Sequence, residues 1–227
     1  MGERMPDLPL RHRSAMRVLG PLTGVAALRL EDETPLFAAD RDFAWDHGGP
    51  ITRRFVEGLP ADRAQPVVID SSLVWLAPGL GHGFELGGGG HPRAPLRFTH
   101  EPFPDVVTGV RGASNRNRSA LHRMCVLGVD CTPELASGEV LFADAETAAA
   151  FWLPEDGFAF RDAEIARRCD EGSLVREAIP LGVVIEFGWG ALMRPRPSAV
   201  TGFQFILRAT IGDPRPQVNG RRNHSIV

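Results

Sequence analysis

Three histidines, His82, His91 and His100, recur nine residues apart in a glycine-rich stretch, and Glu101 follows the last of them. Imidazole and carboxylate groups bind divalent ions such as zinc at about 2.0–2.2 Å, and glycine lets a loop fold around the ion. The same side chains transfer protons without a metal. The tight patterns HxH and HExxH do not occur. We therefore predict acid and base groups at His82, His100 and Glu101. The cofactor is either a divalent metal ion held by His82, His91 and His100 or none, and ordinary polar loop histidines are the alternative.

Arginine and asparagine residues gather in the segment that follows, at Arg111, Asn115, Arg116 and Arg118. A guanidinium group binds carboxylate or phosphate through two parallel hydrogen bonds, and asparagine and backbone amides complete such a site. The segment therefore predicts a site for a small anionic molecule. A solvated loop, whose arginines pair with surface acids, is the alternative. Nucleic acid is disfavoured as a partner because the segment lacks interleaved aromatic residues and the net charge is −3.

A second acid and imidazole pair stands at Asp46 and His47, directly before two glycines and Pro50. Proline is common in the first turn of a helix, so this pair is expected where one helix begins. We predict that Asp46 and His47 transfer protons at the mouth of a cleft. Helix capping and turn formation are the alternative for the same residues.

The three cysteines do not follow a structural zinc pattern. His122 and Cys125 have the spacing of one zinc knuckle, but a tetrahedral site needs four ligands. In a strand these two side chains would also point to opposite faces of the sheet. We therefore predict that Cys125, Cys131 and Cys169, the last a possible fourth ligand, are buried free cysteines that pack as small apolar groups.

Several reaction classes are excluded by residues that the chain lacks. All 25 basic residues are arginine, and there is no tyrosine. The chain therefore has no lysine for a Schiff base or for a P-loop, and no tyrosine for proton transfer. No GxSxG elbow occurs, and Ser71 and Ser72 lie inside a predicted strand, so we assign no nucleophile. No dinucleotide fingerprint GxGxxG occurs either.

Length and composition predict one globular domain over residues 1–227, with an extended arm at 1–13 and a tail at 212–227. The chain has 227 residues, and 43% of them are hydrophobic, enough for a real core. Three cysteines and no charged-then-apolar leader predict a cytoplasmic protein. No apolar stretch approaches the roughly 20 residues that span a bilayer, so we expect no membrane partner. The sequence does not decide whether the protein forms a homo-oligomer.

The elements that must position these residues are short, because 25 glycines and 19 prolines interrupt the chain. Helices are predicted near 50–58, from Asp144 to Leu153 and from Asp162 to Gly172, at capping and stop signals. Alternating or β-branched apolar runs predict strands; they are 14–19, 24–31, 66–76, 105–110, 124–129, 138–142, 181–189 and 201–211. The last two are expected to be antiparallel neighbours.

These elements predict an α+β fold with a mostly antiparallel sheet, barrel-like or a two-layer sandwich, and about three short helices. The function we expect is a small-molecule enzyme of the hydrolase or lyase type. Its anionic substrate would be held by arginines, with histidine and carboxylate groups from the region 82–123 as acids and bases. The alternative is a non-catalytic binding or assembly protein that uses its Pro- and Gly-rich loops and termini.

Overall fold

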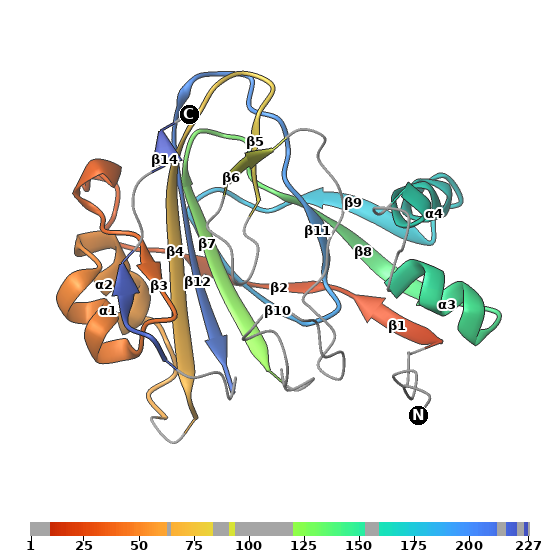
Figure 1. Cartoon of the computed structure of the whole chain (residues 1–227), viewed down its shortest axis with the longest axis horizontal. Helices are drawn as coiled ribbons and strands as arrows, with labels where there is room; N and C mark the ends of the chain where they lie inside the picture. The colour runs from red at the N-terminus through yellow and green to blue at the C-terminus, as the bar shows by residue number, and fades with distance from the viewer. Residues whose placement is uncertain are drawn as a thin grey trace, which may run out of the picture.

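A computed structural model describes residues 10–62, 65–83, 91–93, 120–152, 159–212, 217–221 and 225–226 (Figure 1). Its main sheet has six strands, and all neighbours are antiparallel except the edge pair β14 and β4. In spatial order the strands are β14 (Ser225–Ile226), β4 (Val67–Leu76), β12 (Gly202–Ile211), β7 (Leu121–Gly128), β10 (Val183–Gly188) and β2 (Met16–Pro21). The two central strands, β12 and β7, are therefore not consecutive along the chain.

A second, smaller sheet is built around β8 (Glu134–Leu141). This strand pairs antiparallel with β1 (Arg11–Ser14), β9 (Leu174–Ala178) and β11 (Leu192–Arg194). Two two-stranded ladders complete the described strands: β3 (Leu36–Phe37) with β13 (Gly220–Arg221), and β5 (Gly81–Gly83) with β6 (His91–Arg93).

Four α-helices accompany the sheets in the described part of the chain, as two pairs. Helices α1 (Arg41–His47) and α2 (Pro50–Glu57) lie beside β4, whereas α3 (Ala145–Trp152) and α4 (Ala159–Asp170) lie at the opposite end, on the small sheet (Figure 1). The predicted class, a mixed α+β fold that is mostly antiparallel, is confirmed, and no described sheet closes into a barrel.

The predicted helix starts are confirmed at two positions. Helix α2 begins at Pro50, and the carboxylate of Asp144 accepts the Thr147 N–H at 2.8 Å just before α3. Helix α1 was not predicted as a separate element. Its cap is local, since Asp40 accepts the Phe43 N–H at 2.7 Å, but α1 has only seven residues.

Two strand predictions are wrong. Strands β10 and β12 are not neighbours, because β7 lies between them and pairs with both. The residues 24–31 do not form a strand. They form a turn in which the Leu28 N–H donates to Val25 O, and the chain then enters the 3₁₀ helix η1 (Leu30–Asp32). The predicted strand at 105–110 lies outside the described residues.

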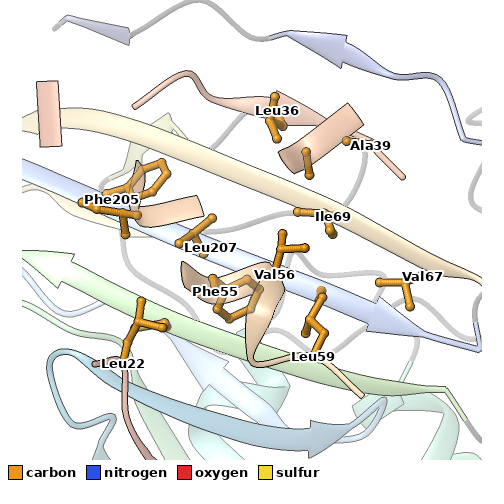
Figure 2. Packing of buried hydrophobic residues seen from close by; sticks show 14 of the residues in the cluster. Leu22, Leu36, Ala39, Phe55, Val56, Leu59, Val67, Ile69, Phe205 and Leu207 are labelled. Carbon is orange, nitrogen blue, oxygen red and sulfur yellow. The ribbon is translucent and has the colours of Figure 1, made fainter. Parts of the chain in front are cut away.

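Both faces of the main sheet are buried. On the first face, Ile69 of β4 and Leu207 of β12 pack against Phe55 of α2 (Figure 2). On the second face, Met124 and Ile206 join a separate apolar cluster with side chains such as Leu135 of the small sheet. Polar side chains on this second face are therefore taken out of water.

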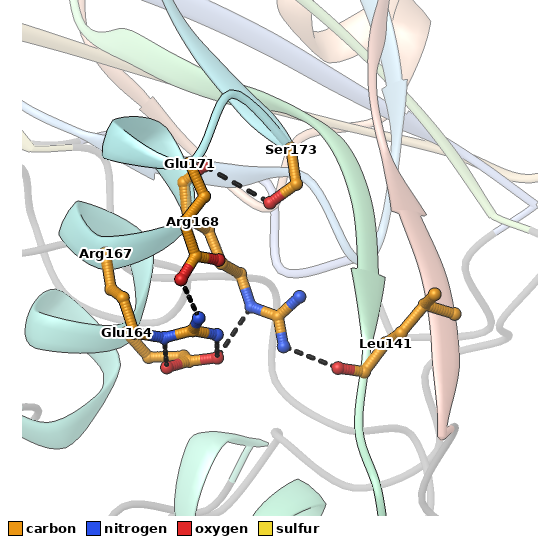
Figure 3. Close-up of polar contacts among 6 residues, drawn as sticks. All are labelled: Leu141, Glu164, Arg167, Arg168, Glu171 and Ser173. Carbon is orange, nitrogen blue, oxygen red and sulfur yellow. Dashed lines mark hydrogen bonds and ion pairs between the residues drawn. The ribbon is translucent and has the colours of Figure 1, made fainter.

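The arginines of α4 tie this helix to the small sheet. Arg168 donates from Nε to Glu164 and from Nη2 to the Leu141 carbonyl of β8 (Figure 3). Its guanidinium carbon also lies 5.4 Å from the centroid of the Phe142 ring. One hydrogen bond to β8 and one cation–π contact with Phe142 thus hold the helix against the small sheet, and the bond to Glu164 lies within α4.

Helix α2 is capped by a residue distant in sequence. Gly49 precedes Pro50 and has no side chain to cap with, but Glu33 accepts the Ile51 N–H at 2.6 Å and the Thr52 N–H at 3.1 Å. We expect Glu33→Ala to lower the free energy of unfolding by about 2 kcal/mol, because these buried donors lose their acceptor. Urea unfolding measures this loss.

Glu31 is the matched control for this prediction. It lies in the same 3₁₀ turn, but its side chain is 49% exposed and its ion pair with Arg29 spans 3.8 Å. Glu31→Ala should leave the unfolding midpoint in place. Equal losses in the two variants would contradict the capping role of Glu33.

His12 of β1 makes folding depend on pH. Its ring lies 5.3 Å from Trp152 and 4.8 Å from Trp189, and its Nε2–H donates to Gly190 O at 3.1 Å. Burial lowers the pKa of His12, and the bond to Gly190 opposes this only in part. The unfolded chain then binds more protons below about pH 6.5, so the free energy of unfolding should fall as the pH drops through that value.

Urea unfolding at about pH 7.5 and about pH 5.5 measures this slope in the wild type and in His12→Gln. The variant should lose part of the difference between the two pH values. His47→Gln is the control, because this ring is bound by Arg221 at an exposed position. An unchanged slope in His12→Gln would show that other groups cause the pH dependence.

Candidate functional site

Seven buried polar side chains lie on the second face of the main sheet, and we call them the polar row. Residues directly opposite in an antiparallel pair share a face, and so do residues two apart in a strand. Strand register therefore places Asp70, Ser72, Arg208 and Thr210 together. All members are at most 5% exposed; they are Asp70, Ser72, His82, His122, Gln204, Arg208 and Thr210.

The first contact in the polar row joins Ser72 and His82. His82 Nε2 lies 3.0 Å from Ser72 Oγ, and the ring is fully buried. His82 lies in β5, six residues after the end of β4 at Leu76, and the turn at Gly79 (φ 85°) brings the chain back to β4. A serine hydroxyl within hydrogen-bond reach of an imidazole is the arrangement that activates a nucleophile. Ser72 can donate to Nε2 when the ring proton is on Nδ1.

The second contact joins Asp70 and Arg208, which stand opposite each other in the register of β4 and β12. Arg208 Nη2 lies 4.0 Å from Asp70 Oδ2, and both side chains are 2% exposed. The other carboxylate oxygen accepts the Ala38 N–H at 3.0 Å. A charge-assisted hydrogen bond would be about 2.7–2.9 Å long, so this ion pair is attractive without a hydrogen bond between the two atoms.

The third contact lies one strand further, at His122 of β7. Its Nδ1 is 3.1 Å from Thr210 Oγ1, and its ring stacks on Phe187 of β10 at 5.2 Å between centroids. His122 is therefore held on two sides. It can serve as a second proton-transferring group or as a fixed part of the core.

Gln204 lies near the opposite end of the polar row. Its Nε2 donates to Cys131 Sγ at 3.1 Å and is 3.5 Å from Val129 O. Its Oε1 is buried, and no described residue donates a hydrogen bond to it. Turning the amide would bring the oxygen towards the Val129 carbonyl, so the assignment of the two amide atoms is supported by their neighbours.

The cysteine prediction is confirmed for Cys125 and Cys131, whereas Cys169 of α4 is free but only partly buried. Cys125 and Cys131 are free and buried, and Cys125 lies on the first face with Leu207 while His122 lies on the second. Burial raises the pKa of the Cys125 thiol to about 12. Burial also raises the pKa of Cys131, against the opposing effect of hydrogen bonds from Ser198 and Gln204. Neither thiol is a thiolate nucleophile at neutral pH.

Of the catalytic residues predicted from the glycine-rich stretch, the structure places His82 in the polar row. The backbone of His91 pairs with Gly83 in the ladder of β5 and β6. The other predicted residues of this region lie outside the described residues; they are His100, Glu101, Arg111, Asn115, Arg116 and Arg118. Within the described ranges, no group of three or more His, Cys, Asp or Glu side chains could hold a metal ion.

Asp46 and His47 lie in the last turn of α1, away from the polar row. Arg221 Nη2 donates to His47 Nδ1 at 2.8 Å, and the His47 ring contacts Phe43 at 4.3 Å between centroids. A shallow hollow of about 260 Å³ opens near the start of the same helix, with Asp40, Arg41 and Asp42 on its wall. His47 does not line this hollow.

Arg208, Gln204 and Thr210 were not predicted from the sequence as members of a site. In 201–211 these residues alternate with Phe205, Leu207 and Ala209, which predicts one apolar and one solvated face. Ile206 is an apolar residue in the middle of this polar series, which argues against exposure of that face to solvent. It indicates that the second face is covered as well.

Among the helices that the structure describes, none combines the length and the apolar character of a membrane-spanning segment. The chain matches no protein-family model, no curated protein and no solved structure.

Proposed function

We propose that this protein is a small-molecule hydrolase, with Ser72 as the nucleophile and His82 as the general base. The observation that supports the proposal is the 3.0 Å contact between His82 Nε2 and Ser72 Oγ. Hydroxyl and base stand within about 2.6–3.2 Å in enzymes that use serine nucleophiles. The arginines predicted from the sequence, Arg111, Arg116 and Arg118, would hold an anionic substrate.

The reaction balances with these two groups and water. His82 Nε2 takes the Ser72 proton while Oγ bonds to the carbonyl carbon of an ester, and Nε2 then gives that proton to the leaving alcohol as the C–O bond breaks. Water attacks the acyl-serine, its proton passes through Nε2 to Oγ, and the acid leaves. Since Ser72 is only 5% exposed, the site suits small acyl groups.

The residues that lie outside the described ranges keep their predicted roles in this proposal. Arg111, Arg116 and Arg118 would bind the anion, and His100 with Glu101 would assist proton transfer. The sequence also predicts a metal ion held by His82, His91 and His100. Metal analysis of the purified protein would test this form of the site.

Covalent labelling tests the nucleophile without knowledge of the substrate. A small fluorophosphonate should modify the native protein at Ser72, with fluoride as the leaving group, and peptide mass spectrometry should locate the adduct. Ser72→Ala should abolish labelling. His82→Gln should slow labelling by about 10²–10⁴-fold, because the base no longer takes the proton.

Ser71→Ala is the matched control. Ser71 is the next residue in β4, is equally buried and faces the other side of the sheet, where its Oγ accepts the Leu36 N–H at 2.8 Å. It should keep full labelling at Ser72. A folded wild type that is not modified at Ser72 would overturn the proposal.

One observation favours the alternative, an assembly protein. Edge strand β2 of the main sheet exposes Val18 by 56% and Leu19 by 39%, and edge strands pair readily with other chains. If assembly is the function, the protein should sediment as an oligomer and Val18→Glu should release monomers. A monomer at all concentrations would remove this alternative.

A further inference from the structure

Ser72 lies between two other members of the polar row. In the register of β4 and β12, Ser72 stands opposite Ile206, so Gln204 and Arg208 are its two diagonal neighbours. Diagonal neighbours on one sheet face are about 7–8 Å apart, within reach of long side chains. A small molecule bound at Ser72 therefore meets a guanidinium group on one side and a carboxamide on the other.

Arg208 gives the position beside Ser72 a preference for a negatively charged ligand. The nearest carboxylate oxygen in its ion pair, Asp70 Oδ2, is 4.0 Å from Nη2, and Asp70 also accepts from the Ala38 backbone. A guanidinium group in such a pair can still form charge-assisted hydrogen bonds with an incoming anion. Because Asp70 already offsets much of the positive charge, a singly charged carboxylate fits better than a doubly charged phosphate.

Gln204 gives the other side a preference for a hydrogen-bond donor. Its Nε2 is directed to Cys131 and Val129, whereas its buried Oε1 receives no hydrogen bond from the described residues. A buried acceptor without a donor costs free energy, and a ligand that donates a hydrogen bond removes that cost. A ligand hydroxyl or amide N–H would supply it.

We infer that Arg208 and Gln204 determine substrate specificity, and that the substrate is a short ester carrying a carboxylate on one side and a hydrogen-bond donor on the other. This inference rests on the proposed function, since it takes Ser72 as the point of attack. Arg208 and Gln204 are binding groups here, and they take no part in the proton transfers of the reaction.

Two pairs of p-nitrophenyl esters test the inference on the full-length protein. Hydrogen succinate and butyrate differ in a carboxylate that replaces a methyl group, and glycolate and propionate differ in a hydroxyl that replaces a methyl group. The wild type should prefer the first ester of each pair in kcat/KM, by at least about tenfold for the carboxylate. The double variant Asp70→Asn with Arg208→Met should lose the carboxylate preference, and Gln204→Met the hydroxyl preference.

Arg123→Met is the matched control, because Arg123 is an ion-paired arginine on the opposite face of the same sheet. It should keep both preferences, since a general loss of stability does not alter a ratio between two esters. If one binding-site variant does not fold, the other variant and the wild-type ratios still decide.

The outcomes separate the two proposals. Hydrolysis that depends on Ser72 but shows neither preference, or preferences that survive both variants, would overturn the specificity inference and leave the hydrolase proposal standing. Absence of Ser72-dependent hydrolysis with all four esters would overturn both.

Discussion

His82→Gln should lower kcat/KM for p-nitrophenyl esters by about 10³-fold, through kcat rather than KM. The imidazole is needed only while the proton of Ser72 moves, so its removal destabilises the transition state and leaves the bound ester unchanged. Glutamine is close to histidine in size and keeps a hydrogen bond to Ser72 Oγ, which lies 3.0 Å from His82 Nε2. Steady-state kinetics against pH is the measurement. The remaining rate of the variant should rise in proportion to hydroxide, which replaces the base.

Two other histidines control for this result. His12→Gln alters a partly buried ring of β1, which belongs to the small sheet and not to the sheet of Ser72, and should keep the wild-type pH profile of kcat at temperatures where it is folded. His47→Gln tests the second acid and base pair predicted from the sequence. A large loss in His47→Gln together with normal rates in His82→Gln would move the base to α1 and contradict the assignment.

Local patterns were enough to predict most of the secondary structure. The β-branched run at 66–76 became β4, with Val67, Ile69 and Leu73 on one face as its alternation indicates. The cap at Asp144 and the start of α2 at Pro50 also depend on neighbouring residues. Such features follow from hydrogen bonds and side-chain directions within one or two turns of chain.

The order of strands could not be predicted from such patterns. Strand β7 lies between β10 and β12, and β4 pairs with β12 although about 130 residues separate them. Nothing in an isolated strand names its partner, because apolar alternation suits any neighbour with the same face. The cap of α2 by Glu33 is similar, since it joins residues 18 apart across a tertiary contact.

The candidate site was predicted only through His82, for the same reason. The register of β4 and β12 brings Ser72 and Arg208 together, whereas His82 belongs to β5 and reaches Ser72 from outside this register. Ser72 is not on a nucleophile elbow, so its sequence context does not indicate a nucleophile. The contact with His82 depends on the turn after β4, which a motif search does not detect.

Arg161→Met should cause the largest loss of stability of the changes considered, about 3 kcal/mol. The Arg161 side chain is almost fully buried, and it donates from Nε to Phe151 O at 2.8 Å and from Nη2 to Trp152 O at 2.9 Å. These carbonyls belong to the last turn of α3, which lacks partners within the helix and carries partial negative charge. Burial lowers the pKa of Arg161 to about 10, so the group remains charged at neutral pH.

Methionine fills much of the same volume but donates no hydrogen bond, so both carbonyls would lose the hydrogen bond that Arg161 donates to them. For a chain of this size a loss of 3 kcal/mol corresponds to a fall in Tm of about 6–12 °C, which scanning calorimetry measures. Arg167→Met is the matched control in the same helix (Figure 3), because its ion pairs with Glu164 and Glu171 are exposed to solvent and should hardly affect Tm. If the two variants melt together at the wild-type temperature, the end of α3 does not depend on Arg161. A large fall for Arg161→Met alone would show that one buried guanidinium joins α3 to α4, as its two carbonyl contacts indicate.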